Sequence, residues 1–526
     1  MAMAAMADPY VHLMWGKMIL YNRLFTDGLY PLGYNSLIAS LGRLSQIDLY
    51  DVVRFIGPIG SSILVVGYFW FIKEVTKKEV LAVIGMVAFG LSTFNGLPVE
   101  FFRQTLSLSM EFSISLIFPG IIFLHNYLVK GDRNDLLLFG ITVVDVVIIH
   151  SYGALFFVLA TASLMLSSMI NRVLTFKKFI PIVVVGISGG IIGMLPIIIG
   201  KLQGVKWHTV STSWISSNIR IQSPQHIIVE FAKDIVTLPP HIIIIGGLVL
   251  CSLLGSSIVS ALTSRGRENL WDATVFILML IVMLLYFGPD NGFSLLDYSR
   301  VKMYLTMCLL AGFLLFIANS LNFIERILQK IGSFSWRNLT FATLMKTCLI
   351  TSFTVSWLLV YPFQLTADNE MALRPIEYNS AVSIYYRVKK DYPRYDWTLV
   401  APVEQYQEAF GYGYHYELWK FNEDFTMEDA LNPAFDIPIP TTYIFIYVEK
   451  VPLRIWTNNE LATTPEGHKG KTEIHYRDAA GRAKLEKSMW EWCEAYLKTH
   501  DNMTVFYEDE VLKVYKVVHD PARWMK

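Results

Sequence analysis

Charge and cysteine are both scarce in this chain of 526 residues. Only 17% of the residues are charged, whereas 53% are hydrophobic and the mean hydropathy is +0.42. Since soluble domains carry about 25% charged residues, the composition excludes an ordinary water-soluble protein and indicates a membrane protein. The formal net charge is zero. Neither half of the chain is basic enough for a nucleic-acid-binding protein.

Several familiar motifs are also missing. The four cysteines, three of them in apolar runs, offer no disulfide framework and no CxxC metal site. The first twelve residues lack the basic and apolar regions of a signal peptide. There is no Walker A motif, and no GxGxxG followed by a helix. The glycine-rich run 186-193 lies in an apolar stretch, where close helix packing explains it better than phosphate binding.

What the sequence does contain is a series of apolar windows. A helix needs roughly 20 apolar residues to cross a bilayer, and ten windows meet or approach that length. They are residues 52-72, 78-98, 108-128, 134-149, 151-170, 179-200, 241-262, 271-287, 301-319 and 341-361. The pair 134-149 and 151-170 has an alternative interpretation as one long tilted helix broken at His150.

Every second loop between these windows is short and basic, which predicts the cytoplasmic side. These loops contain Lys73, Lys77 and Lys78; Lys130 and Arg133; Arg172, Lys177 and Lys178; Arg265 and Arg267; and Arg326, Lys330 and Arg337. The alternating segments, 1-51, 99-107, the turn at His150, 201-240, 288-300 and the tail, are then extracytoplasmic. An exported N-terminus without a preceding span suggests that a first helix is missing from this reading frame.

The tail has a different composition. Residues 363-526 are more than twice as charged per residue as residues 1-362, and carry a net charge of −7 against +7. Alternating patterns predict strands at 397-400, 443-448, 505-507 and 511-517, and helical periodicity predicts helices at 376-390 and 483-497. We therefore expect an outer segment at 1-51, an α-helical multi-pass membrane domain of about ten helices at 52-362, and a small soluble α/β domain at 363-526. The aromatic segment 412-416 either stacks on sugar rings or packs the tail against the membrane domain, and packing is favoured.

The first candidate residue in the predicted outer segments is a carboxylate. In Asp8-Pro9-Tyr10-Val11-His12, the acid and the imidazole stand four residues apart, on one helical face if Pro9 begins a helix. Asp8 is either a helix N-cap or a functional carboxylate. We select Asp8 as the candidate catalytic residue and His12 as a candidate substrate ligand.

Further candidates lie in the other outer loops. Glu100, Arg103 and Gln104 flank two phenylalanines at a membrane boundary, where the arginine either snorkels or clamps a phosphate with its planar fork. His150 is a substrate candidate, although a satisfied interfacial histidine is the favoured alternative. Tyr298 and Arg300 precede the span at 301-319, and Arg300 is either an interfacial anchor or a second phosphate ligand. The loop 201-240 is polar and aromatic, and long enough to cover a cavity.

Taken together, these features resemble the GT-C superfamily of membrane glycosyltransferases. The matching parts are the acidic motif at 8-12, the Tyr-Pro-rich segment 30-37, the segment 48-55 that leads into a span, and the soluble C-terminal domain. Two departures stand out. Family members begin with a transmembrane helix before the acidic loop, and this sequence shows none there. The Trp-Trp-Asp motif of oligosaccharyltransferase catalytic subunits is also missing, which disfavours transfer to asparagine.

The resemblance implies a glycosyltransferase that moves a hexosyl or pentosyl group, with inversion, from a polyprenyl-phosphate sugar to a glycan, lipid or protein acceptor on the outer face of the cell membrane. Asp8 would act as general base, and Arg103 or Arg300 would stabilise the leaving phosphate. No nucleotide is needed. Asp8, His12 and Glu100 are possible ligands of a divalent metal, but their spacing is not diagnostic and disfavours a tightly held structural ion.

Two other functions stay open at this point. A transporter or flippase of a lipid-linked glycan should bury charge in the middle of its spans, whereas a transferase should gather charge at one interface. Glu111 and Asp145 are the acids expected at mid-membrane depth. A non-catalytic scaffold whose outer domain binds a partner is the third possibility.

Overall fold

The computed structural model describes residues 7–92, 107–208, 220–221, 240–262, 270–287, 293–294, 298–330, 377–402, 404–452 and 479–520. It divides the chain into two compact units. One, here called the helical unit, contains residues 25–37 and 56–369. The other, the α/β unit, combines residues 1–24, 38–55 and 370–526, so that the N-terminal helices belong with the C-terminal domain.

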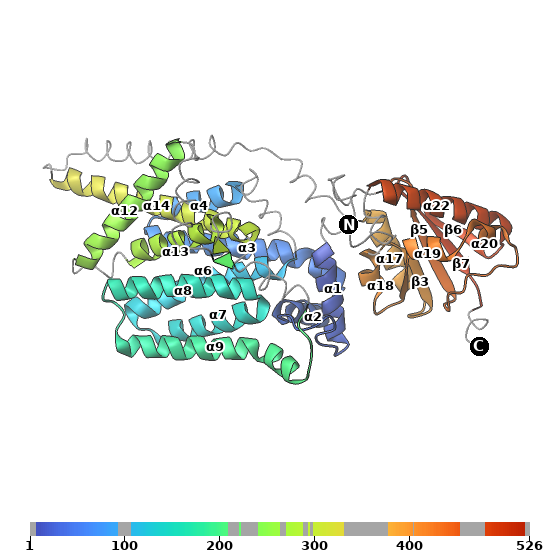
Figure 1. Cartoon of the computed structure of the whole chain (residues 1–526), viewed down its shortest axis with the longest axis horizontal. Helices are drawn as coiled ribbons and strands as arrows, with labels where there is room; N and C mark the ends of the chain where they lie inside the picture. Colours follow the sequence, from blue (N-terminus) through green and yellow to red (C-terminus); the bar gives the residue numbers. More distant parts are fainter. Residues whose placement is uncertain are drawn as a thin grey trace. The chain divides into compact units, whose positions relative to one another are not determined.

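The helices are the dominant elements of the described chain (Figure 1). Near the N-terminus lie α1 (Ala7–Leu20) and α2 (Gly33–Ser45). The apolar helices are α3 (Leu49–Thr76), α4 (Glu79–Ser92), α6 (Ser109–Lys130), α7 (Arg133–Ile149), α8 (Ser151–Ile170), α9 (Phe176–Leu202), α12 (Pro240–Leu262), α13 (Leu270–Phe287) and α14 (Tyr298–Lys330). Each predicted window from 52-72 to 301-319 coincides with one of these helices, and the window 341-361 lies outside the described residues.

Five of the described helices are long and apolar enough to cross a membrane. They are Leu49–Thr76, Ser109–Lys130, Ser151–Ile170, Phe176–Leu202 and the Met303–Ile327 part of α14. Several of the remaining windows form shorter helices, such as α7 with 17 residues, so the predicted count of about ten spans is not confirmed. On α9, the side chains of Val184, Ile187 and Ile191 are more than half exposed, which suits a surface facing lipid.

The break at His150 is real, so the interpretation of 134-149 and 151-170 as one helix is wrong. His150 has an extended backbone (φ −161°, ψ 135°), and its Nδ1 accepts a hydrogen bond from the N–H of Tyr152 at 3.1 Å. It thereby caps α8. At the opposite end of α7, the Asp132 side chain accepts from the N–H of Asn134. The preceding helix α6 stops at Gly131, whose φ of 79° is a left-handed conformation that glycine adopts at little cost.

The glycine-rich run in α9 packs as predicted. A Cβ on Gly189 would lie 3.1 Å from the carbonyl oxygen of Gly140, and one on Gly193 would lie 2.8 Å from Val147. Gly186 and Gly190 face open space. Small residues four apart therefore let α9 approach α7 closely, and Figure 1 shows α6 to α9 running side by side.

The C-terminal domain contains a mixed five-stranded sheet of order β4-β3-β5-β7-β6. Its strands are β3 (Trp397–Ala401), β4 (Tyr414–Glu417), β5 (Tyr443–Glu449), β6 (Met503–Glu508) and β7 (Leu512–Val518). The first three run parallel, and β7 lies antiparallel to both β5 and β6. The helices of this domain are α17 (Asn379–Asp391), α18 (Glu404–Ala409), α19 (Leu418–Asp424), α20 (Met427–Leu431) and α22 (Ala479–Thr499).

All four predicted strands and both predicted helices of the tail are confirmed within a few residues. Central strand β5 is buried along nearly its whole length, as its continuous apolar sequence requires. The edge strand β4 was not predicted, because its tyrosines read as an aromatic cluster rather than as an alternating strand. The helical unit contains two further short strands, β1 (Arg220–Ile221) and β2 (Phe293–Ser294), which pair antiparallel.

Candidate functional site

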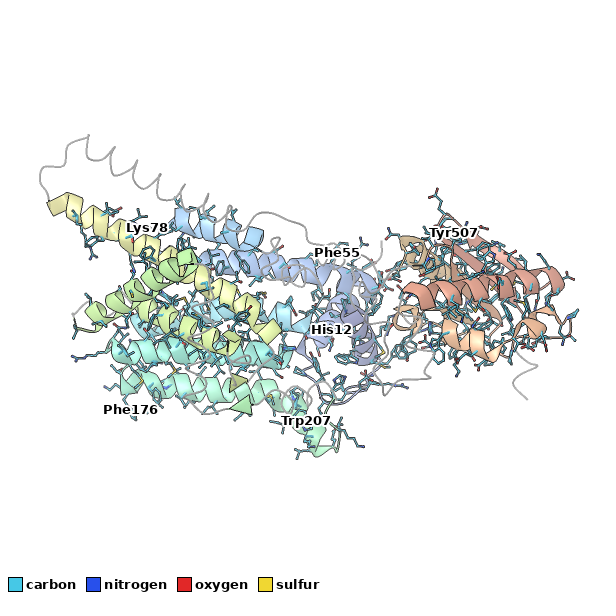
Figure 2. The ribbon with its side chains drawn as sticks, turned by 45° about the horizontal axis from the view of Figure 1, so that its top comes forward. His12, Phe55, Lys78, Phe176, Trp207 and Tyr507 are labelled. Atoms are coloured by element: carbon cyan, nitrogen blue, oxygen red, sulfur yellow. The ribbon has the colours of Figure 1, made fainter. Side chains whose placement is uncertain are left out.

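The basic loops of the helical unit lie at one end of its helices, and the loops between them in the sequence lie at the other end. At the basic end, Lys78 lies 3.9 Å from Glu325 near the end of α14, and Ser167 near the end of α8 donates to the carbonyl of Leu270 at 2.7 Å. Figure 2 shows Lys78 and Phe176 at this end and Trp207 at the other. The two sets of loops that the basic residues distinguish are therefore also separated in space.

At the end opposite the basic loops, Tyr30 contacts residues from several segments of the chain. Its hydroxyl lies 3.2 Å from the Ser109 hydroxyl, and its ring packs edge-to-face against His150 and His208, with centroids 6.0 and 5.9 Å away. We call these four residues the Tyr30 cluster. They come from the N-terminal segment, the start of α6, the α7–α8 turn and the segment after α9. Three predicted outer segments and the start of α6 therefore meet at one side chain.

Two backbone contacts reinforce this arrangement. Leu29 forms a parallel bridge with Trp207, and strands β1 and β2 join the loops 201-240 and 288-300. Gly33, in the Tyr-Pro segment, comes so close to the end of α7 that a Cβ there would lie 2.8 Å from the carbonyl oxygen of Ile148. A larger residue would push the Tyr-Pro segment away from this end.

The predicted catalytic acid lies in the first turn of α1, which belongs to the α/β unit. The described helix begins at Ala7, two residues before Pro9, so Asp8 is inside the helix instead of preceding it. The fourth residue after it, His12, is 5% exposed, and its ring packs edge-to-face against Trp15 at 5.8 Å. The side chain of Asp8 lies outside the described atoms, so its role as a base remains a prediction.

The other predicted ligands divide between described and undescribed parts. Glu100, Arg103 and Gln104 lie outside the described residues. Tyr298 and Arg300 form the first turn of α14, but their side chains are not described. His150 is described, and its capping bond agrees with the favoured interpretation of a satisfied histidine.

Sequence reasoning placed Glu111 at mid-membrane depth, whereas the structure places it near one end of its helix. Glu111 is the third residue of α6 and is 2% exposed, close to Ser109 of the Tyr30 cluster. The apolar window extended past it, because the residues on both sides of it are uncharged. Asp145 lies four residues before the end of α7.

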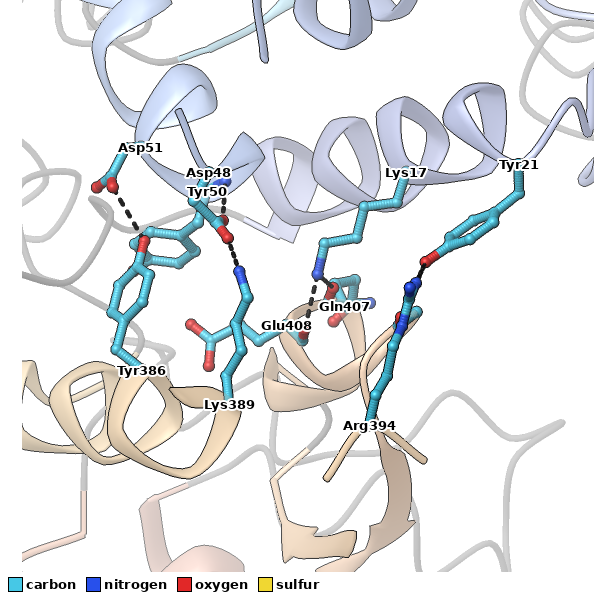
Figure 3. A network of polar contacts seen from close by, with 11 residues as sticks. Lys17, Tyr21, Asp48, Tyr50, Asp51, Tyr386, Lys389, Arg394, Gln407 and Glu408 are labelled. Atoms are coloured by element: carbon cyan, nitrogen blue, oxygen red, sulfur yellow. Dashed lines mark hydrogen bonds and ion pairs between the residues drawn. The ribbon is translucent and has the colours of Figure 1, made fainter. Parts of the chain in front are cut away.

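A buried polar network ties α1 and the start of α3 to the C-terminal domain, all inside the α/β unit (Figure 3). Its centre is the carboxylate of Glu377, which accepts hydrogen bonds from the hydroxyls of Tyr10 and Tyr50, the latter at 2.6 Å, and from the Gln405 side chain at 3.0 Å. We call Tyr10, Lys17, Tyr50, Glu377 and Glu408 the Glu377 cluster. Each is at most 3% exposed.

Two carboxyl groups in this cluster lie side by side. Burial raises the pKa of Glu377, and burial together with the neighbouring Glu377 raises the pKa of Glu408 well above its ordinary value. Like charges in a buried site cannot both ionise cheaply. The pair therefore keeps a proton to a higher pH than an isolated carboxyl group does.

A buried lysine closes the network from α1. The Nζ of Lys17 donates to the carbonyls of Gln407 and Glu408 at 2.9 and 2.6 Å, as Figure 3 shows. Burial lowers its pKa to about 7. Around it, Lys389 pairs with Asp48, the Tyr386 hydroxyl donates to Asp51 at 3.1 Å, and Arg394 donates to Tyr21. These contacts fix the helix that carries Asp8 against α17 and α18.

Sequence reasoning missed the Glu377 cluster. Lys17, alone in the apolar stretch between Val11 and Leu20, was a usable signal of a buried charge. Glu377 and Glu408 had no such signal, because Tyr10 and Tyr50 are 367 and 327 residues away from Glu377.

Comparison with known proteins gives two structural likenesses. The chain is similar to the crystal structure of ArnT from Cupriavidus metallidurans bound to undecaprenyl phosphate, with a TM-score of 0.49 and 9% identity over 99% of this chain and 95% of that one. It is also similar to the Archaeoglobus fulgidus oligosaccharyltransferase in complex with zinc and sulfate, with a TM-score of 0.40 and 11% identity over 85% of this chain and 64% of that one. No family model and no curated protein matches.

Neither likeness assigns a family to this chain. At TM-scores below 0.5 and about one identical residue in ten, they fix neither an activity nor the role of any residue in this chain. The chemistry therefore has to be argued from the residues themselves.

Proposed function

We propose that this protein is a membrane glycosyltransferase that moves a sugar from a polyprenyl-phosphate donor to an acceptor at the extracytoplasmic face, with inversion at the anomeric carbon. The observation that carries the proposal is the gathering of three predicted outer segments and the start of α6 at Tyr30, at the end of the helical unit opposite the basic loops. A lipid-linked donor presents its phosphate at such a membrane boundary.

In this proposal Asp8 removes the proton from the acceptor hydroxyl as the sugar transfers. A carboxylate within hydrogen-bond reach contributes about 10²–10⁴-fold to such a step. The phosphate leaves with growing negative charge, which Arg103 or Arg300 stabilises more in the transition state than in the ground state. The Glu377 cluster supports this role, because its hydrogen bonds hold α1 in one position.

The position of acidic residues favours a transferase over a transporter. In the described apolar helices every acid lies within five residues of a helix end, including Glu111, Asp145 and Asp272. Asp272, in the first turn of α13, accepts a hydrogen bond from Asn319 at 3.0 Å. A relay of acids through the middle of the spans is not seen in this part of the chain.

The test is Asp8→Asn in purified protein supplied with a radiolabelled polyprenyl-phosphate sugar. We expect transfer to fall by at least about 100-fold with unchanged expression, whereas the exposed Asp501→Asn keeps full activity. Full activity of the Asp8 variant would refute its role as the base. Release of donor across proteoliposomes without any transfer would favour the flippase.

A further inference from the structure

A cavity in the α/β unit is lined mainly by aromatic rings. It has a volume of about 570 Å³, and six of its lining residues are Tyr21, Tyr395, Tyr406, Phe410, Tyr414 and His415. They come from the end of α1, the turn before β3, helix α18 and strand β4. We call it the tyrosine cleft.

The most exposed tyrosines of the described chain gather in this cleft. Among the described residues, four tyrosines are more than a third exposed, namely Tyr21, Tyr395, Tyr406 and Tyr414, and all four line this cleft. Exposed aromatic side chains that gather on one concave surface are typical of a binding site.

The cleft is held in shape by its surroundings. Tyr395 has a φ of 63°, rare for a tyrosine, and its N–H donates to the carbonyl of Tyr412 at 2.7 Å. Arg394 lies over the Tyr395 ring at 5.0 Å and donates to the carbonyl of Gly411 at 2.8 Å. Strain of this kind persists only where neighbouring contacts enforce it, and it is found at binding sites.

Glycines complete the lining. Gly411 has a φ of 85°, and a Cβ on Gly413 would lie 2.3 Å from the Trp397 ring. Both positions therefore require glycine. Both glycines are buried, and their small size lets the Tyr21 and Trp397 rings pack directly against the backbone.

The lining chemistry selects the class of ligand. None of the described residues lining the cleft has an aliphatic side chain, and none is acidic. An acyl chain or an apolar peptide face would be expected to meet leucine, isoleucine or methionine. Tyrosine instead offers a flat apolar ring together with a hydroxyl, which matches a sugar ring with one apolar C–H face and a rim of hydroxyls.

The geometry points to an oligosaccharide-binding site in the tyrosine cleft, and this site holds the sugar chain of the acceptor. That the bound sugar chain belongs to the acceptor rests on the proposed function, whereas saccharide binding itself does not. Burial lowers the pKa of His415 to about 4, and its Nε2 lies 3.0 Å from the carbonyls of Ala401 and Pro402. Its ring is therefore neutral at pH 7 and adds an uncharged face.

The experiment is saturation-transfer NMR on the full chain, held in a detergent without a sugar head group. The probes are cellotetraose, chitotetraose, maltotetraose and a mannose tetrasaccharide, with a proline-rich peptide as the alternative ligand. We expect at least one tetrasaccharide to bind. Tyr414→Ala and Tyr406→Ala should each weaken it by roughly fivefold to tenfold, the loss of one stacked ring.

Tyr507→Ala is the matched control, because Tyr507 is a partly exposed tyrosine on strand β6, outside the cleft. It should leave binding unchanged. No binding of any tetrasaccharide, equal binding by the cleft variants, or stronger binding of the peptide would overturn the assignment. Intact saccharide binding with no transfer activity would overturn the proposed function alone, and intact transfer with no saccharide binding would overturn the cleft alone.

Discussion

Glu408 should make the stability of the α/β unit depend on pH. Its carboxyl is fully buried beside Glu377, and both pKa values are raised, by burial first. An acid with a raised pKa stabilises the fold below its unfolded pKa, and this stability is lost as the pH rises through the folded pKa. Glu408→Gln keeps the shape and removes the titration.

The magnitude follows from one proton. Between pH 5 and pH 6.5 the unfolded chain has released the carboxyl proton, whereas the raised pKa values favour its retention in the folded pair. The free energy of unfolding should then fall by about 1.4 kcal/mol per pH unit, or about 2 kcal/mol over this window. Lys17 does not interfere, because its pKa is lowered only to about 7 and it is protonated in both states below that pH. Above pH 7 the folded state releases the Lys17 proton before the unfolded state does, so Lys17 then makes the free energy of unfolding rise with pH.

The assay is thermal unfolding of the full chain in detergent, followed by tryptophan fluorescence at pH 5, 5.75 and 6.5. The Glu408→Gln protein should lose less stability across the window than the unchanged protein, by roughly 4–8 °C in Tm. Exposed Glu510→Gln is the control and should keep the original slope. An unchanged slope in Glu408→Gln would contradict the proton held by the pair.

Three further predictions follow from the packing and the topology. The buried carboxylate of Glu449 accepts hydrogen bonds from Arg482 Nη2 at 2.5 Å and from Nε at 2.8 Å. Arg482→Ala leaves this carboxylate buried without its cation and should destabilise the α/β unit by about 3–5 kcal/mol in thermal unfolding. A loss below about 1 kcal/mol would contradict a buried pair. Gly193→Ala should cost about 1–3 kcal/mol through its clash with Val147, whereas Gly190→Ala should cost nothing, and equal effects in melting experiments would refute the α7–α9 contact. With Cys251 replaced by serine, cysteines at Lys78 and Trp207 should react with impermeant reagents from opposite sides of the membrane, and labelling from one side would rule out the assigned orientation.

The sequence predicted local elements well and long-range contacts poorly. Apolar windows and alternating strands depend on neighbouring residues, which is why the helices from α3 to α14 and strands β3, β5, β6 and β7 were found. Strand β4 escaped because only four residues form it and most of them are aromatic. The basic loops also predicted which segments meet, since charge and topology are linked.

The Glu377 cluster could not be predicted, because it joins residues from opposite ends of the chain. The polarity of Glu377 and Glu408 reads as ordinary surface character in a charged tail. Only the fold shows that tyrosines from α1 and α3 bury them. For the same reason the sequence offered sugar stacking at 412-416 only as the less favoured alternative to packing, without the partners Tyr21, Tyr395 and Tyr406 that line the cleft.

The central claim is tested most directly by a density map of the full chain with a polyprenyl phosphate bound. The account predicts that the phosphate lies within hydrogen-bond reach of Arg103 or Arg300, with the Asp8 carboxylate facing the position of the sugar. A phosphate bound at the basic end, near Lys78 and Lys178, would contradict the account and remove the active site from the extracytoplasmic face.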